Sequence, residues 1–102
     1  MNQAQLMQQM RKMQQEMSAA QEELAATVVT GSAAGGSVQV EMTCDHRVKS
    51  LKIAKEAIDP EDAETLEDLV VVALNDALKN VEATAAGRMG RVTGGVRIPG
   101  LT

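Results

Sequence analysis

The sequence predicts an α+β fold with a long N-terminal helix, a three-stranded antiparallel sheet, a second helix packed on the sheet and a flexible C-terminal tail. Apolar residues follow a heptad spacing at the start of the chain, a spacing of two in its middle and a wide helical stripe near its end. With 102 residues and a net charge of −4, the chain forms one small acidic domain. We expect this domain over residues 1–86 and the tail over residues 87–102.

A first helix is expected from about residue 3 to residue 26. Its apolar positions alternate in steps of four and three, as in a coiled coil, within a stretch rich in Gln, Met, Ala and Glu. This seam consists of Leu6, Met10, Met13, Met17, Ala20 and Leu24. Asn2 is placed to cap a helix of about 36 Å, which outreaches the small body behind it. Part of the seam is therefore left for a partner.

Three antiparallel strands are expected over residues 27–53, the minimum for a stable small sheet. The run 27–30 is β-branched, and apolar residues alternate with polar ones over 38–43 and again over 48–53. The glycine-rich run 31–36 is expected to form a flexible hairpin turn. The run is not a phosphate-binding loop, because it lacks that motif's glycine spacing and its Lys-Ser/Thr ending.

The second helix has clear local signals at both ends. Asp59 is expected as its N-cap, Pro60 as its first residue, and several acidic residues follow in the first turns. Gly87 is expected to end the helix after Ala86. The wide apolar stripe between these ends should cover the sheet. The sequence beyond Gly87 contains four further glycines and Pro99, which predicts a flexible tail.

Charge is distributed unevenly along the chain. Residues 56–86 carry nine acidic side chains and one lysine, a net charge of −8. Residues 1–55 carry a net charge of +1, and residues 87–102 carry +3 with no acidic residue. A polyanion can therefore be bound if the acidic segment faces elsewhere.

The core is expected to be modest and aliphatic. Phe, Tyr and Trp are absent, and Leu, Ile and Val together make 22 of the 102 residues. Because a domain of this size buries a limited share of its surface, we expect a second copy to supply further apolar contact in a homodimer. The residues expected at the dimer interface are Leu6, Met10, Met13, Met17 and Leu24.

The sequence indicates no catalytic or metal site. His46 is the only histidine and Cys44 the only cysteine, whereas a structural zinc site needs about four ligands. Asp59 and Asp62 are better explained by the helix start than by acid–base catalysis. We therefore expect a non-enzymatic protein with no cofactor, no metal and no small-molecule substrate. The single cysteine and the absence of a long apolar run favour a cytoplasmic protein without a membrane segment.

Five basic residues are candidates for contact with nucleic-acid phosphates. They are Arg11, Lys12, Arg88, Arg91 and Arg97. The first two lie off the heptad seam, and the other three lie in the acid-free C-terminal segment. Without aromatic residues there is no stacking platform for unpaired bases, which favours a duplex held by its phosphates. The glutamines of the first helix either read adenine edges or serve as helix-compatible polar residues.

Several motifs occur in an order typical of one family. They are Asp59-Pro60-Glu61-Asp62, Leu66-Glu67-Asp68-Leu69-Val70, Ala73-Leu74-Asn75-Asp76-Ala77-Leu78, Val29-Thr30-Gly31, Val48-Lys49-Ser50-Leu51-Lys52-Ile53 and Met89-Gly90-Arg91-Val92-Thr93-Gly94-Gly95. In this order and spacing the chain resembles the YbaB/EbfC family of nucleoid-associated proteins. The resemblance implies a homodimer of α-β-β-β-α subunits that binds DNA in the bacterial nucleoid and organises the chromosome or modulates gene expression.

Two positions depart from the family pattern. Cys44-Asp45-His46 stands where relatives often carry Asn-Gly, and Leu74 stands where many have Phe. Both departures should change packing or turn shape more than function. A second function remains open from the residues alone, namely an adaptor that binds another protein through the Met-rich projecting helix.

Overall fold

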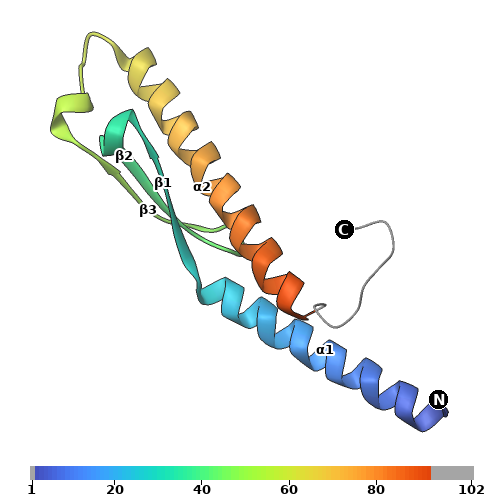
Figure 1. Ribbon diagram of the computed structural model, residues 1–102. Coiled ribbons are helices and arrows are strands. Elements are labelled where there is room, and N and C mark those ends of the chain that lie inside the picture. The colour runs from blue at the N-terminus through green and yellow to red at the C-terminus, as the bar shows by residue number, and fades with distance from the viewer. Residues whose placement is uncertain (1, 93–102) are drawn as a thin grey trace, which may run out of the picture.

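The computed structural model describes residues 2–92, and the fold class expected from the sequence is confirmed (Figure 1). The elements are α1 (Gln3–Ala26), β1 (Val28–Ala33), β2 (Val38–Thr43), β3 (Val48–Ile53) and α2 (Ala63–Val92). Short 3-10 turns lie at Ala34–Gly36 and Lys55–Ala57. The expected tail lies outside the described residues from residue 93 onward.

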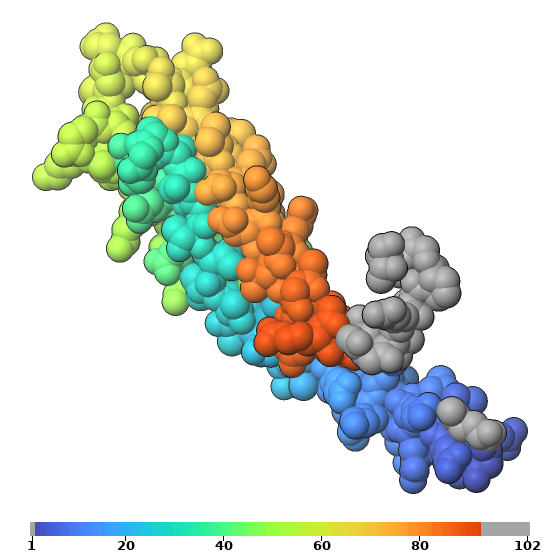
Figure 2. Space-filling view, viewed as in Figure 1, coloured from blue at the N-terminus to red at the C-terminus, as the bar shows by residue number. Residues whose placement is uncertain are grey.

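Helix α1 is a projecting rod. Asn2 caps its start, because the Asn2 Oδ1 accepts a hydrogen bond from the Gln5 backbone N–H at 2.8 Å. Only Ala20 and Leu24 of this helix are buried. Figure 2 shows α1 continuing beyond the last turn of α2, and the molecule measures 70 × 27 × 16 Å. About 17 residues, or roughly 25 Å of helix, therefore extend away from the body.

The three strands form one antiparallel sheet in the order β1-β2-β3. Gly31 pairs with Val40, and Val40 pairs with Leu51. Helix α2 lies over β1 and β2 and leaves β3 largely uncovered (Figure 1). The side chains of β2 that face α2 are Val38, Val40 and Met42, and all three are buried. Their period-two spacing is what the sequence predicted.

The first hairpin turn is shorter than the sequence suggested. Residues 31–36 were expected as a flexible turn, but β1 continues through Ala33. The turn itself is tight, and its backbone takes positive φ at Ala34 (52°), Gly35 (68°) and Gly36 (99°). The prediction was wrong for Gly31 because a glycine within a strand also serves close backbone approach, which the local sequence does not distinguish from a turn.

Both expected ends of α2 require correction. The N-cap is Asp62 rather than Asp59: Asp62 accepts hydrogen bonds from the Thr65 backbone N–H at 3.3 Å and from the Thr65 hydroxyl at 2.6 Å. These bonds hold the pKa of Asp62 below its ordinary value. Asp59 instead accepts from the Glu61 backbone N–H in the preceding turn. The helix also continues through Gly87 to Val92 rather than ending at Ala86.

Helix α2 contacts the sheet through small residues. A Cβ on Gly31 would lie only 2.3 Å from the Ala73 carbonyl oxygen and from the Ala77 backbone nitrogen. The helix can therefore rest directly on the β1 backbone. At this distance two side chains of α2 reach the outer edge of β1. Asp76 Oδ2 accepts from the Ser32 N–H at 2.9 Å, and Asn80 Nδ2 donates to the Thr30 carbonyl at 2.7 Å.

We predict that Gly31→Ala lowers the free energy of unfolding by about 2 kcal/mol or more, because its methyl group meets immovable backbone atoms. The matched control is Gly87→Ala within α2, where nothing lies within 4 Å of the added Cβ. This control should raise the free energy of unfolding by about 0.5–1 kcal/mol, since alanine favours a helix over glycine. Urea titration followed by circular dichroism measures both. Equal midpoints for Gly31→Ala and the parent would contradict the close approach.

We also predict that Asp62→Ala lowers the urea midpoint more than Asp59→Ala does, because only Asp62 caps α2. The pKa of Asp62 is lowered in the folded state, so its contribution to stability is present above the unfolded pKa and is lost as pH falls below about 4. The difference between the two variants should therefore be largest near pH 7 and should shrink toward pH 2. A larger effect of Asp59→Ala would restore the sequence-based cap.

Candidate nucleic-acid interface

Two neighbouring basic residues of α1 lie on different sides of the helix. Successive residues of an α-helix are about 100° apart around its axis. Arg11 accordingly borders a shallow hollow with Met7, Met10 and Gln14. Lys12 borders another hollow with glutamines instead. The two cations were expected to act together from the sequence, but the structure separates them.

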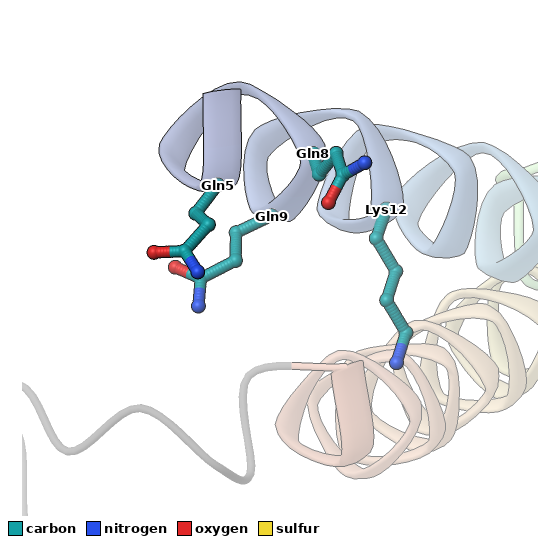
Figure 3. A pocket seen from close by; sticks show the side chains of 4 residues that line it. All are labelled: Gln5, Gln8, Gln9 and Lys12. Carbon is teal, nitrogen blue, oxygen red and sulfur yellow. The ribbon is translucent and has the colours of Figure 1, made fainter. Parts of the chain in front are cut away.

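Lys12 belongs to a polar surface with three amide side chains. Gln5, Gln8 and Gln9 line the same open hollow as Lys12. Figure 3 shows the Lys12 amine directed toward the last turns of α2, with Gln5 and Gln9 beside each other on the preceding turns. A primary amine and several amides on one helix face supply donors for phosphate oxygens and for base edges.

The end of α2 adds two arginines to the same side of α1. Arg88, Arg91 and Val92 of α2 line a hollow together with Glu16 and Ala19 of α1. Glu16 lies one helical turn after Lys12, so this hollow continues the polar surface toward the body. We call the combined surface the α1–α2 face. Its residues are Gln5, Gln8, Gln9, Lys12, Glu16, Ala19, Arg88 and Arg91.

Arg88 already has an anionic partner within the chain. Its Nε donates to the Glu23 carboxylate, and only 22% of the Arg88 side chain is exposed. The hydrogen bond from Arg88, its positive charge and the charge of Arg91 together hold the pKa of Glu23 below its ordinary value. This pair was not predicted from the sequence, because the two residues are 65 positions apart and no local pattern relates them.

The remaining candidates differ in what the structure says of them. Arg91 is exposed beside Arg88 at the end of α2. Arg97 lies outside the described residues. The acidic first turns of α2 and the projecting half of α1 lie at opposite ends of the long axis (Figure 1). The negative charge of the chain is therefore concentrated away from the α1–α2 face.

Exposed apolar residues mark two surfaces. On α1, Leu6 and Met10 are 49% and 59% exposed, and Met13 and Met17 are each 37% exposed. Leu24 packs in the core of its own subunit, so the seam left for a partner consists of the other four residues expected at the dimer interface. A second surface surrounds β3, where Val48 and Leu51 are about half exposed. Such patches are typical of protein contacts.

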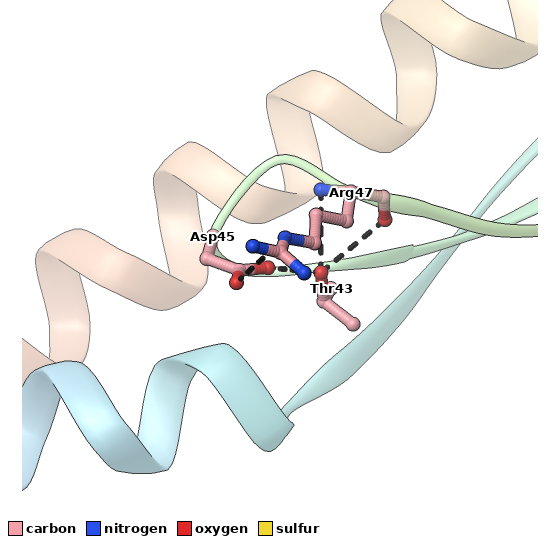
Figure 4. A network of polar contacts seen from close by, with 3 residues as sticks. All are labelled: Thr43, Asp45 and Arg47. Atoms are coloured by element: carbon pink, nitrogen blue, oxygen red, sulfur yellow. Dashed lines mark hydrogen bonds and ion pairs between the residues drawn. The ribbon is translucent and has the colours of Figure 1, made fainter.

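The turn that holds Cys44 and His46 has a structural explanation. The Thr43 hydroxyl donates to Asp45, the Arg47 backbone N–H donates to the Thr43 hydroxyl, and Asp45 pairs with Arg47 (Figure 4). Cys44 is buried, and burial raises the pKa of its thiol. Within residues 2–92 no group of three His, Cys, Asp or Glu side chains is arranged to hold a metal.

Known proteins share this chain's sequence over nearly its whole length. The sequence model of the YbaB/EbfC DNA-binding family matches residues 1–96. A nucleoid-associated protein of Chloroflexus aurantiacus is 47% identical over 97 residues, 95% of this chain and 97% of that protein. Another of Roseiflexus sp. (strain RS-1) is 48% identical over 101 residues, 99% of this chain and 100% of that protein.

A solved structure shares the fold. The crystal structure of an uncharacterised protein from Helicobacter pylori is similar with a TM-score of 0.78 and 28% sequence identity. The similarity covers 92% of this chain and 99% of that one. Neither α1 nor α2, the two long helices in the described part of the chain, combines the length and apolar character needed to cross a membrane.

Proposed function

Because the chain belongs to the YbaB/EbfC DNA-binding family, we propose that it binds duplex DNA as a homodimer, largely through phosphate contacts, in the bacterial nucleoid. In this role it organises the chromosome or modulates gene expression without catalysing a reaction. Relatives that match nearly the whole chain carry the name nucleoid-associated protein.

The α1–α2 face is the observation that carries this proposal. It presents Lys12 and Arg91 with three glutamines, while the acidic start of α2 lies at the far end of the molecule. A helix about 10–12 Å across, which projects freely, fits the major groove of B-DNA, which is about 12 Å wide. Lysine and arginine then neutralise backbone phosphates, and Arg11 on the adjacent side of α1 reaches phosphates of the other groove wall.

The homodimer is supported by the exposed apolar residues of a small aliphatic domain. Leu6, Met10, Met13 and Met17 form a stripe on α1 that no part of residues 2–92 buries. A second copy removes such a stripe from water and doubles the number of basic groups available to a duplex. The C-terminal arginines, Arg97 among them, add contacts from the end of each chain.

We predict that binding to a duplex weakens steeply with salt. If the dimer neutralises about 4–8 phosphates, log affinity should fall with log salt at a slope of about −4 to −7. Lys12→Gln and Arg91→Gln should each reduce the slope by about one unit for every phosphate that the variant leaves without a cation, and should weaken all sequences alike. The matched control is Glu61→Gln/Glu64→Gln, at the opposite end, which should leave binding equal to or tighter than that of the parent. Mobility-shift titrations at several salt concentrations measure these effects.

Two outcomes would contradict the model of DNA binding. A parent protein without a saturable shift would favour the adaptor function of the Met-rich helix instead. Loss of binding in the acidic control, with retention in the Lys12 and Arg91 variants, would place the wrong end of the molecule on the DNA. Arg11→Gln, tested separately, shows whether the opposite side of α1 also contacts the duplex.

We predict that Met13→Lys/Met17→Lys shifts the protein from dimer to monomer, because it places charges in the apolar stripe of α1. Leu51→Lys on β3 is the matched control, since Leu51 is similarly exposed but belongs to the other apolar surface. Sedimentation velocity at micromolar concentration measures both. A monomeric Leu51→Lys protein beside a dimeric Met variant would move the interface to the surface around β3.

A further inference from the structure

The direction of α1 depends on a short stretch of contact. Thr27 alone separates α1 from β1, and Ala20 and Leu24 are the only buried residues of the helix. Leu24 belongs to the same core cluster as Val81 of α2, and Met89 packs against that cluster. The rod is therefore held at one end only.

One ion pair crosses this contact. Among residues 2–92, the pair between Glu23 and Arg88 is the one ion pair that joins the two helices. Glu23 precedes Leu24 and points about 100° away from it around the helix axis. The apolar contact and the ion pair consequently hold α1 on two different sides, which restricts both its tilt and its rotation.

A small change at this point is amplified along the rod. Lys12 lies about 16 Å of helix from Glu23, and the start of α1 lies about 30 Å from it. A tilt of about 10° would move Lys12 by roughly 3 Å and the tip by roughly 5 Å. The shift at Lys12 is comparable to the axial spacing of phosphates on one DNA strand, which is about 3.4 Å.

We propose that Arg88 is a positioning residue: through its ion pair with Glu23 it fixes the direction of α1, and so the register in which the cations of α1 meet a duplex. Arg88 does not itself contact phosphate. This inference rests on the proposed function and deepens it. Because exposed ion pairs contribute little to the stability of a fold, the pair acts on the orientation of α1 rather than on folding.

The direction of α1 can be measured without DNA. Spin labels at Gln14→Cys in α1 and Asn75→Cys in α2, in a Cys44→Ala background, report the distance between the two helices by pulsed electron resonance. Labelled chain is mixed with excess unlabelled chain, so that distances within one subunit dominate. Arg88→Gln and Glu23→Gln should each broaden or shift the distance distribution. The matched control is Glu22→Gln, next to Glu23, which should leave the distribution unchanged.

The same variants separate positioning from phosphate contact. If Arg88 positions α1, Arg88→Gln and Glu23→Gln should both weaken duplex binding by about two- to fivefold with the salt slope unchanged. The swap Glu23→Arg/Arg88→Glu should restore both the distances and the affinity to within about twofold of the parent. Unaltered circular dichroism and unfolding midpoints show that the fold is intact.

Two results would overturn the inference. Distance distributions that are unchanged in Glu23→Gln show that the pair does not orient α1, whether or not the protein binds DNA. Alternatively, Arg88→Gln could lower the salt slope by about one unit per subunit while Glu23→Gln binds as tightly as the parent, which would assign Arg88 to phosphate contact. A parent without DNA binding refutes the proposed function, whereas the distance measurement still decides the orienting role.

Discussion

The contact between Gly31 and α2 is the constraint on which the rest of the structure depends. With no side chain at Gly31, the helix backbone at Ala73 and Ala77 rests on the strand itself. This contact places α2 over β1 and the buried residues of β2, and it leaves β3 largely uncovered. It also aligns α2 so that its last turns pass α1, which creates the surface shared by the two helices.

Local sequence patterns predicted the order of elements because those patterns are properties of neighbouring residues. The first helix, the period-two strands and the Asn2 cap are all confirmed. The errors occur where two local signals compete or where a distant contact decides. Both Asp59 and Asp62 bond to nearby backbone N–H groups, but Asp62 is the one that caps the helix. Gly87 did not end α2, because a glycine inside a packed helix lowers its stability only modestly.

The candidate site was predictable in part. The basic residues of α1 and of the C-terminal segment were found from charge alone, and helical geometry would have separated Arg11 from Lys12. The assembly of Lys12 and Arg91 on one side was not predictable, because it depends on where α2 crosses α1. The engagement of Arg88 by Glu23 has the same origin, since no pattern within either helix indicates a partner 65 residues away.

The hydrogen bonds from α2 to β1 also bear on the behaviour of the chain in a crowded cell. A small sheet has two outer strands, and free backbone groups along either one can pair with a strand of another molecule and begin an aggregate. Asp76 and Asn80 occupy groups of this kind on β1. On β3 the exposed Lys49 and Lys52 and the irregular pairing near Glu41 oppose the same reaction by charge and shape. Of the two edges of the described sheet, one is therefore sealed by its own helix and the other defended by lysines, so a chain with so thin an aliphatic core avoids polymerising through its strands.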